Sequence, residues 1–105
     1  MGSIRRFDET KRARATSDPM FRDALLTEAV TQFLGNDLPT GKMLLGDYIE
    51  AGFGFERLAQ EHGIATERLR HVLEPDVDTD AGELLGILAT IQKAAGLRLS
   101  VAISR

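Results

Sequence analysis

The sequence predicts an all-α domain that ends in one short β-strand, and three observations support this. Apolar residues recur at helical spacing, cap and stop signals bound each run, and the last residues change to a period of two. The chain has 105 residues, 43% hydrophobic and 28% charged, which suits one folded domain. We therefore expect a single domain over 18–105, preceded by an arm over 1–17.

The first expected helix begins at Pro19, with Asp18 as N-cap and Gly35 as the stop. Seven apolar residues at helical spacing form or flank its inward face: Phe21, Leu25, Leu26, Ala29, Val30, Phe33 and Leu34. The segment 36–39 is expected to be a turn. A second helix follows the turn and stops near Gly52, with four residues inward: Leu44, Leu45, Tyr48 and Ile49.

The next segment, GFERLAQEHGIATERLRHVL at 54–73, has the pattern of a helix-turn-helix. Ala59 is small enough for a second helix to cross closely, and Gly63, four residues on, suits a left-handed turn. Thr66 is the expected N-cap of the second helix. Four apolar residues fall on the inward sides: Leu58, Ile64, Leu69 and Val72. Together these positions favour a DNA-reading unit over an arbitrary helical hairpin.

A last helix, capped by Thr79 or Asp80, ends before Gly96 and places three residues on one face: Leu84, Leu88 and Ile91. Beyond it, apolar and other residues alternate over 97–103, which is a strand signal. A lone strand needs a partner for its backbone, and the simplest partner is the same strand of a second copy. We expect a homodimer joined at least partly by these strands; the alternative is a segment folded back onto its own helices.

Charge is distributed unevenly along the chain, whose net charge is -3. Residues 1–22 hold six bases and three acids, and the remaining residues hold seven bases and thirteen acids. The basic arm either contacts nucleic acid or is a solvated terminus.

Other chemistry is poorly supported. The glycines at 35–43 have five residues between them and Met43 follows Lys42, so the phosphate-loop pattern fails. The aspartates from Asp76 lack the glycine and the terminal glutamate of a calcium loop. Cysteine is absent, and two histidines form no recognisable triad or metal set. We expect no enzyme, cofactor, metal or membrane span, and a cytoplasmic location.

The segment 54–73, followed by ELLGILATIQKAAGLRLSV, resembles phage-repressor-type helix-turn-helix proteins, specifically the small antitoxins (antidote proteins) of bacterial addiction modules. The segment 18–51 is similar to the N-terminal half of related antitoxins or transcriptional regulators. The resemblance covers about residues 8–102. It implies a repressor-like all-α bundle, autoregulation, operator binding as a dimer, and often a ribosome-dependent ribonuclease toxin as partner. The family's Gly-Asn-Pro-Thr loop is replaced by residues 76–79, of which only Thr79 matches.

The second helix of the unit is expected to enter the major groove by its N-terminal end. Its outward residues would be Ala65, Thr66, Glu67, Arg70 and His71. Arg70 can bond a guanine edge or a phosphate, Thr66 a base or phosphate, and Glu67 a cytosine amino group. Arg57 and Lys42 are lesser candidates for phosphate contact.

The expected function is therefore that of a DNA-binding transcriptional regulator of antitoxin type, which binds a palindromic operator as a homodimer. The alternative is a protein-interaction module with the same fold, because Asp76 and Asp78 would repel phosphates.

Overall fold

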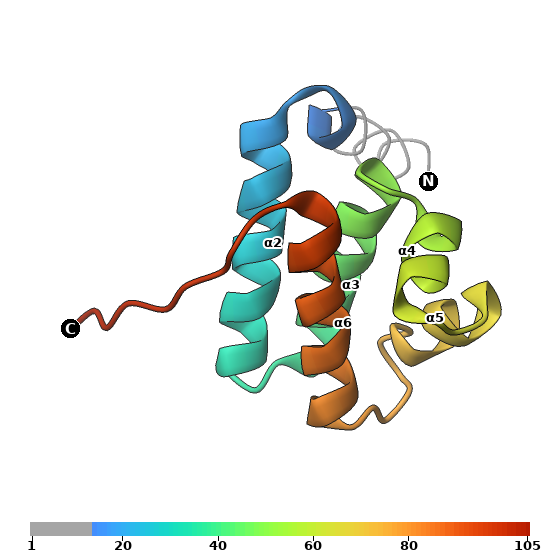
Figure 1. The fold of residues 1–105 in the computed structure, drawn as a ribbon. Coiled ribbons are helices and arrows are strands. Elements are labelled where there is room, and N and C mark those ends of the chain that lie inside the picture. The colour runs from blue at the N-terminus through green and yellow to red at the C-terminus, as the bar shows by residue number, and fades with distance from the viewer. Residues whose placement is uncertain (1–13) are drawn as a thin grey trace, which may run out of the picture.

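The computed structural model describes residues 14–105, and over these residues it is helical with no β-strand, so the predicted all-α class is confirmed. After a helical segment at 14–17, five helices follow one another: α2 (Pro19–Leu34), α3 (Leu38–Ala51), α4 (Phe55–His62), α5 (Thr66–Val72) and α6 (Ala81–Ala95). Figure 1 shows α6 between α2 and the α4–α5 pair, with the C-terminal segment running out past α2.

Residues 14–17 are also helical, although the sequence predicts them to be part of the arm. Ala15 is buried, and Arg22 donates to the carbonyls of Ala15 and Thr16 at 3.0 and 3.2 Å. Arg14 lies 4.5 Å from the ring centre of Phe21. The packed part of the chain therefore includes these residues. The rest of the expected arm, 1–13, lies outside the described residues.

Local capping sets the ends of the α2–α3 hairpin. The Asp18 carboxylate accepts the backbone N–H groups of Met20 and Phe21 at 3.1 and 3.3 Å, and Gly35 ends α2, as predicted. The expected turn over 36–39 is shorter than predicted. Asp37 accepts the N–H of Thr40 at 3.3 Å and so caps α3, which makes Leu38 and Pro39 its first residues.

The two helices of this hairpin cross closely at Gly41. A β-carbon at this position would overlap the Phe33 ring and lie 3.0 Å from the carbonyl oxygen of Ala29. Only glycine lets the α3 backbone come so near to α2 without displacing that ring.

The core collects buried apolar side chains from every helix, including the inward residues predicted for α3 and α6: Leu45, Tyr48, Ile49, Leu84, Leu88 and Ile91. Leu44 is only partly buried.

Burial is the main cause that raises the pKa of the Tyr48 phenol, and the Asp23 carboxylate raises it further. Arg22 lowers this pKa by a smaller amount. Leu34 was predicted to lie beside the core face, but it is 71% exposed at the last position of α2.

The predicted strand over 97–103 is absent from the single chain. Leu97 and Leu99 pack against the core while Arg98 and Ser100 are exposed, so burial alternates over 97–100, but Val101 and Ile103 are exposed as well. No second strand lies beside it in the described chain, and without one no ladder can form. Separately, no helix of residues 14–105 is long and apolar enough to cross a membrane.

We predict opposite effects for the same substitution at two glycines of α3. Gly41→Ala should lower the free energy of unfolding by about 1–3 kcal/mol, because the new methyl group displaces the Phe33 ring. Gly46→Ala should raise it by up to about 1 kcal/mol, because its β-carbon meets only the Phe55 ring edge at 3.9 Å and alanine favours the helix. Urea unfolding of both variants measures this, and equal losses would contradict the close crossing.

Candidate nucleic-acid interface

The candidate interface is the pair α4–α5, which is hinged at Gly63. This glycine is left-handed, with φ 79° and ψ 29°, as its sequence position predicted. The backbone N–H groups of Gly63 and Ile64 both donate to the carbonyl oxygen of Ala59, at 2.8 and 3.0 Å. These bonds satisfy the end of α4 and turn the chain sharply into α5.

Apolar packing holds α5 against the body of the domain. The predicted inward residues Leu58, Leu69 and Val72 are at most 2% exposed, Ala59 is 1% exposed and Ile64 is partly buried. One prediction was wrong: the N-cap of α5 is Ala65, and Thr66 is the first helical residue. The backbone of Ala65 is extended and that of Thr66 is already helical, so the helix begins one residue earlier than a Thr66 cap would require.

The structure places most of the predicted reading residues on one exposed surface of α5. Ala65, Glu67, Arg70 and His71 are exposed, and Thr66 is partly buried. Arg57 is exposed on α4, with its guanidinium carbon 5.3 Å from the Phe53 ring centre. These side chains can therefore meet a ligand from outside, in contrast to Leu69, which is fully buried.

Arg70 is held in place before any ligand arrives. Its guanidinium carbon lies 4.5 Å from the ring centre of Phe55, and a guanidinium nitrogen lies 3.9 Å from a carboxylate oxygen of Glu50. Both side chains of this ion pair are about half exposed, so water screens it. The ring orients the guanidinium while leaving its hydrogen-bond donors accessible.

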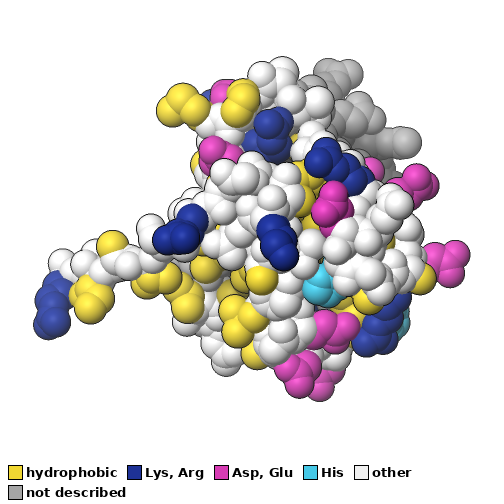
Figure 2. Space-filling model, in the orientation of Figure 1, with side chains coloured by type: hydrophobic (Ala, Val, Ile, Leu, Met, Phe, Trp, Pro, Cys, Tyr) yellow, Lys and Arg dark blue, Asp and Glu magenta, His cyan; other side chains and the backbone are white. Residues whose placement is uncertain are grey.

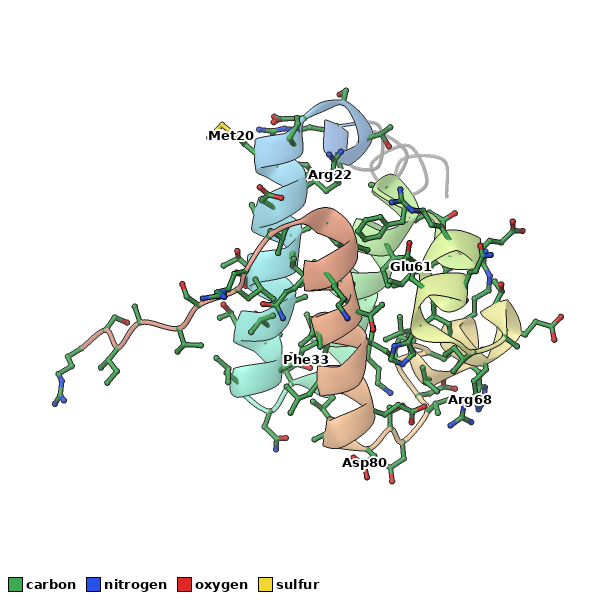
Figure 3. All side chains as sticks on the ribbon, in the orientation of Figure 1. Met20, Arg22, Phe33, Glu61, Arg68 and Asp80 are labelled. Atoms are coloured by element: carbon green, nitrogen blue, oxygen red, sulfur yellow. The ribbon has the colours of Figure 1, made fainter. Side chains whose placement is uncertain are left out.

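Arg68 was not among the residues that the sequence predicted for this surface. This exposed residue of α5, labelled in Figure 3, donates to a carboxylate oxygen of Glu83 on α6 at 3.0 Å. The helix is short, so its exposed surface spans both Arg68 and Arg70. No local spacing signalled the contact, because Glu83 is 15 residues away in the sequence.

Lys42 is not on the surface, which corrects its expected phosphate contact. It is 1% exposed, and its ammonium donates to the Glu74 carbonyl at 3.3 Å, to the Thr79 hydroxyl at 2.8 Å and to the Val77 carbonyl. The ammonium is fully used in tying α3 to the loop between α5 and α6. A buried charge of this kind is tolerated because each donor has an acceptor.

Thr79 belongs to the same cluster and does not cap α6. Its hydroxyl donates to the carbonyl oxygen of Val72, the last residue of α5, at 2.7 Å. The cap is Asp80, whose carboxylate accepts the N–H of Gly82 at 2.6 Å. Of the two predicted caps, the structure selects Asp80.

The surface around α5 is rich in acids. His71 lies 3.9 Å from a Glu74 carboxylate oxygen, and Glu74, Asp76 and Asp78 are exposed on the following loop. Residues 50–80 contain three arginines but eight acidic residues, so negative charges outnumber positive ones. The acids are Glu50, Glu56, Glu61, Glu67, Glu74, Asp76, Asp78 and Asp80. Phosphate binding at this surface must therefore overcome local repulsion.

A pocket of about 580 Å³ opens between α3 and the end of α5. Apolar side chains, among them Met43, Phe55 and Leu73, line it together with the acids Asp47, Glu50 and Glu74 and with Arg70. The pocket thus adjoins the exposed surface of α5.

No cluster of three metal-ligating side chains occurs among residues 14–105. His62 Nδ1 lies 2.7 Å from the Thr90 hydroxyl of α6, while His71 lies on α5. Comparisons of the chain with protein-family models, with curated proteins and with solved structures found no match.

We predict that Lys42→Met lowers the free energy of unfolding by roughly 1–3 kcal/mol. Methionine fills most of the space but leaves the Glu74 and Val77 carbonyls and the Thr79 hydroxyl without their donor. Lys93→Met is the same change at an exposed position of α6, and it should change the free energy of unfolding by less than about 0.5 kcal/mol. If chemical denaturation finds the two variants equally stable, the ammonium does not hold the loop.

Proposed function

We propose that this chain is a DNA-binding transcriptional regulator of antitoxin type, which binds a palindromic operator as a dimer. The observation that carries the proposal is the α4–α5 pair, with its left-handed Gly63, its small Ala59 at the crossing and the exposed outer surface of α5. The sequence resemblance adds a ribonuclease-type toxin as the expected protein partner.

Each exposed residue of α5 has a role that suits its chemistry. Arg70 is stacked on Phe55 with its donors accessible, so it can form a bidentate bond to a guanine edge. Thr66 can bond a base or a phosphate, and Glu67 can accept a hydrogen from a cytosine amino group. Arg68 points to the α6 side of α5 and is the better candidate for a phosphate.

Both arginines of α5 must exchange a carboxylate partner for DNA, Arg70 leaving Glu50 and Arg68 leaving Glu83. This exchange, together with the exposed acids of the 74–78 loop, lowers the affinity of one copy. Two copies bound to half-sites about 34 Å apart would regain affinity, since the second contact becomes intramolecular.

A second candidate is a protein-interaction module that no longer binds DNA strongly. The acidic loop and the adjoining pocket favour it, because Glu50 and Glu74 beside Phe55 and Leu73 suit a basic, partly apolar segment of another protein. The two functions differ in the ligand that occupies the surface of α5.

A mobility-shift titration with the DNA upstream of the chain's own gene separates the two functions. A regulator should shift this DNA at concentrations that leave a scrambled duplex of equal length free. Absence of a specific shift at low salt, for the protein alone and with its partner, would exclude the regulator and favour the interaction module.

We predict that Arg70→Ala weakens binding to the specific duplex by roughly 1–3 kcal/mol, because a bidentate base contact is lost. Lys93→Ala removes the same charge from the exposed side of α6 and should change affinity much less. Fluorescence anisotropy on specific and random duplexes measures both variants. An equal loss on random DNA would show that Arg70 contacts phosphate instead of a base.

A further inference from the structure

The C-terminal segment runs out past α2 (Figure 1), and side chains of both elements line a groove between them. Its volume is about 420 Å³, and its lining comprises Thr27, Val30, Thr31, Leu34 and residues 98–102. Large apolar side chains border it without cover: Leu34 is 71% exposed, Val101 76% and Ile103 85%. Figure 2 shows hydrophobic side chains along this segment and on the adjacent body. The area is thus an exposed surface of two elements in which apolar side chains alternate with the polar Thr27, Thr31, Arg98 and Ser100.

Among residues 14–105, no hydrogen bond pairs the backbone of the segment where its apolar side chains are exposed. The N–H groups of Leu97 and Leu99 donate to the carbonyl and side-chain oxygens of Gln92, at 3.0 and 2.8 Å. Beyond Leu99, the described chain offers no hydrogen-bond partner to the backbone of residues 100–105. An extended segment with free donors and acceptors is a template for a second strand.

The outer side of α2 carries a second, uncharged surface. Five exposed residues follow one another at alternating spacings of four and three: Met20, Ala24, Thr27, Thr31 and Leu34. This spacing places them along one side of the helix, as in a coiled-coil seam. The buried side of α2 is different and consists of Leu25, Leu26 and Ala29. The helix therefore has one side in the core and another that is uncharged and uncovered.

We propose that the groove receives the C-terminal tail, residues 100–105, of a second copy of this chain. The two tails would pair antiparallel. Each tail would lie in the partner's groove, between the tail and the α2 helix of the partner copy. In registers that oppose odd-numbered residues, Leu99, Val101 and Ile103 of both copies share one face. Leu99 already packs against the core, so that face is turned toward the body and its Val30 and Leu34.

Charge favours a second copy as the occupant. The segment 97–105 carries Arg98 and Arg105 and no acid, while Asp23 and Glu28 flank the uncharged side of α2. In a two-fold pair, each basic tail therefore meets the acidic border of its partner's α2.

This inference rests on the dimer that the proposed function includes, but it is independent of DNA binding. If the chain forms the dimer but binds no DNA, the proposed interface is supported and the regulator function is excluded. A monomer that shifts specific DNA would do the reverse.

We expect sedimentation equilibrium of the full chain to show a concentration-dependent dimer. Leu34→Glu should raise the dimer dissociation constant at least about tenfold, because a carboxylate would be buried against the partner's tail. Leu85→Glu, at a leucine of α6 that is 65% exposed, is the matched control and should leave the constant unchanged. Circular dichroism checks that both variants keep their helices. A chain that is monomeric at every concentration, or a dimer equally strong in both variants, overturns the proposal.

Cross-linking provides a second readout, since the chain has no cysteine of its own. Mixed Leu34→Cys and Ile103→Cys proteins, oxidised with copper phenanthroline, should form a disulfide-linked heterodimer. Mixed Leu85→Cys and Ile103→Cys proteins should form far less. A chain carrying both Leu34→Cys and Ile103→Cys that closes an internal disulfide as a monomer would show that the tail covers its own α2, and would overturn the proposal.

Discussion

The buried ammonium of Lys42 is the contact on which the arrangement of the candidate interface depends. It reaches from α3 to the loop between α5 and α6, and through Thr79 it is connected to the last carbonyl of α5. Helix α5 has only seven residues, so it holds its position through its packing and through this loop. One charge inside the domain therefore acts together with the buried Leu69 and Val72 to set the direction in which the exposed surface of α5 faces.

The parts of the fold that could be predicted from the sequence are those with local causes. The Asp18 cap and the Gly63 turn act over two to four residues, so spacing alone reveals them. Lys42 could not be predicted, because its acceptors lie 32 to 37 residues away and an isolated lysine indicates a surface position. Leu34 follows the apolar spacing of α2 but lies beyond the core, since the spacing does not show where the packed side ends.

In the candidate site too, the features with local causes could be predicted from the sequence, and the contacts between distant residues could not. Helical spacing alone predicts that Glu67, Arg70 and His71 lie on the outer side of α5, and all three are exposed there. The carboxylates that hold Arg68 and Arg70 come from α6 and α3, so only the fold brings them together. Such pairing favours selectivity over affinity. A ligand displaces the carboxylate only if it interacts with the arginine more strongly than the carboxylate does. The alternation of the C-terminal segment is also visible in the sequence, but one copy of the chain cannot show what pairs with it.

In the proposed function, the exposed surface of α5 contacts DNA. An amide chemical-shift titration of the ¹⁵N-labelled chain with the DNA upstream of its own gene tests this most directly, because it locates the contact residue by residue. We predict the largest changes at residues 65–71, with smaller changes at the loop 74–79 and at Glu83, which releases Arg68, and none at the exposed far end of α6 around Lys93. Changes confined to α2 and the C-terminal segment, or no change on α5 at saturating DNA, would contradict a contact between α5 and DNA.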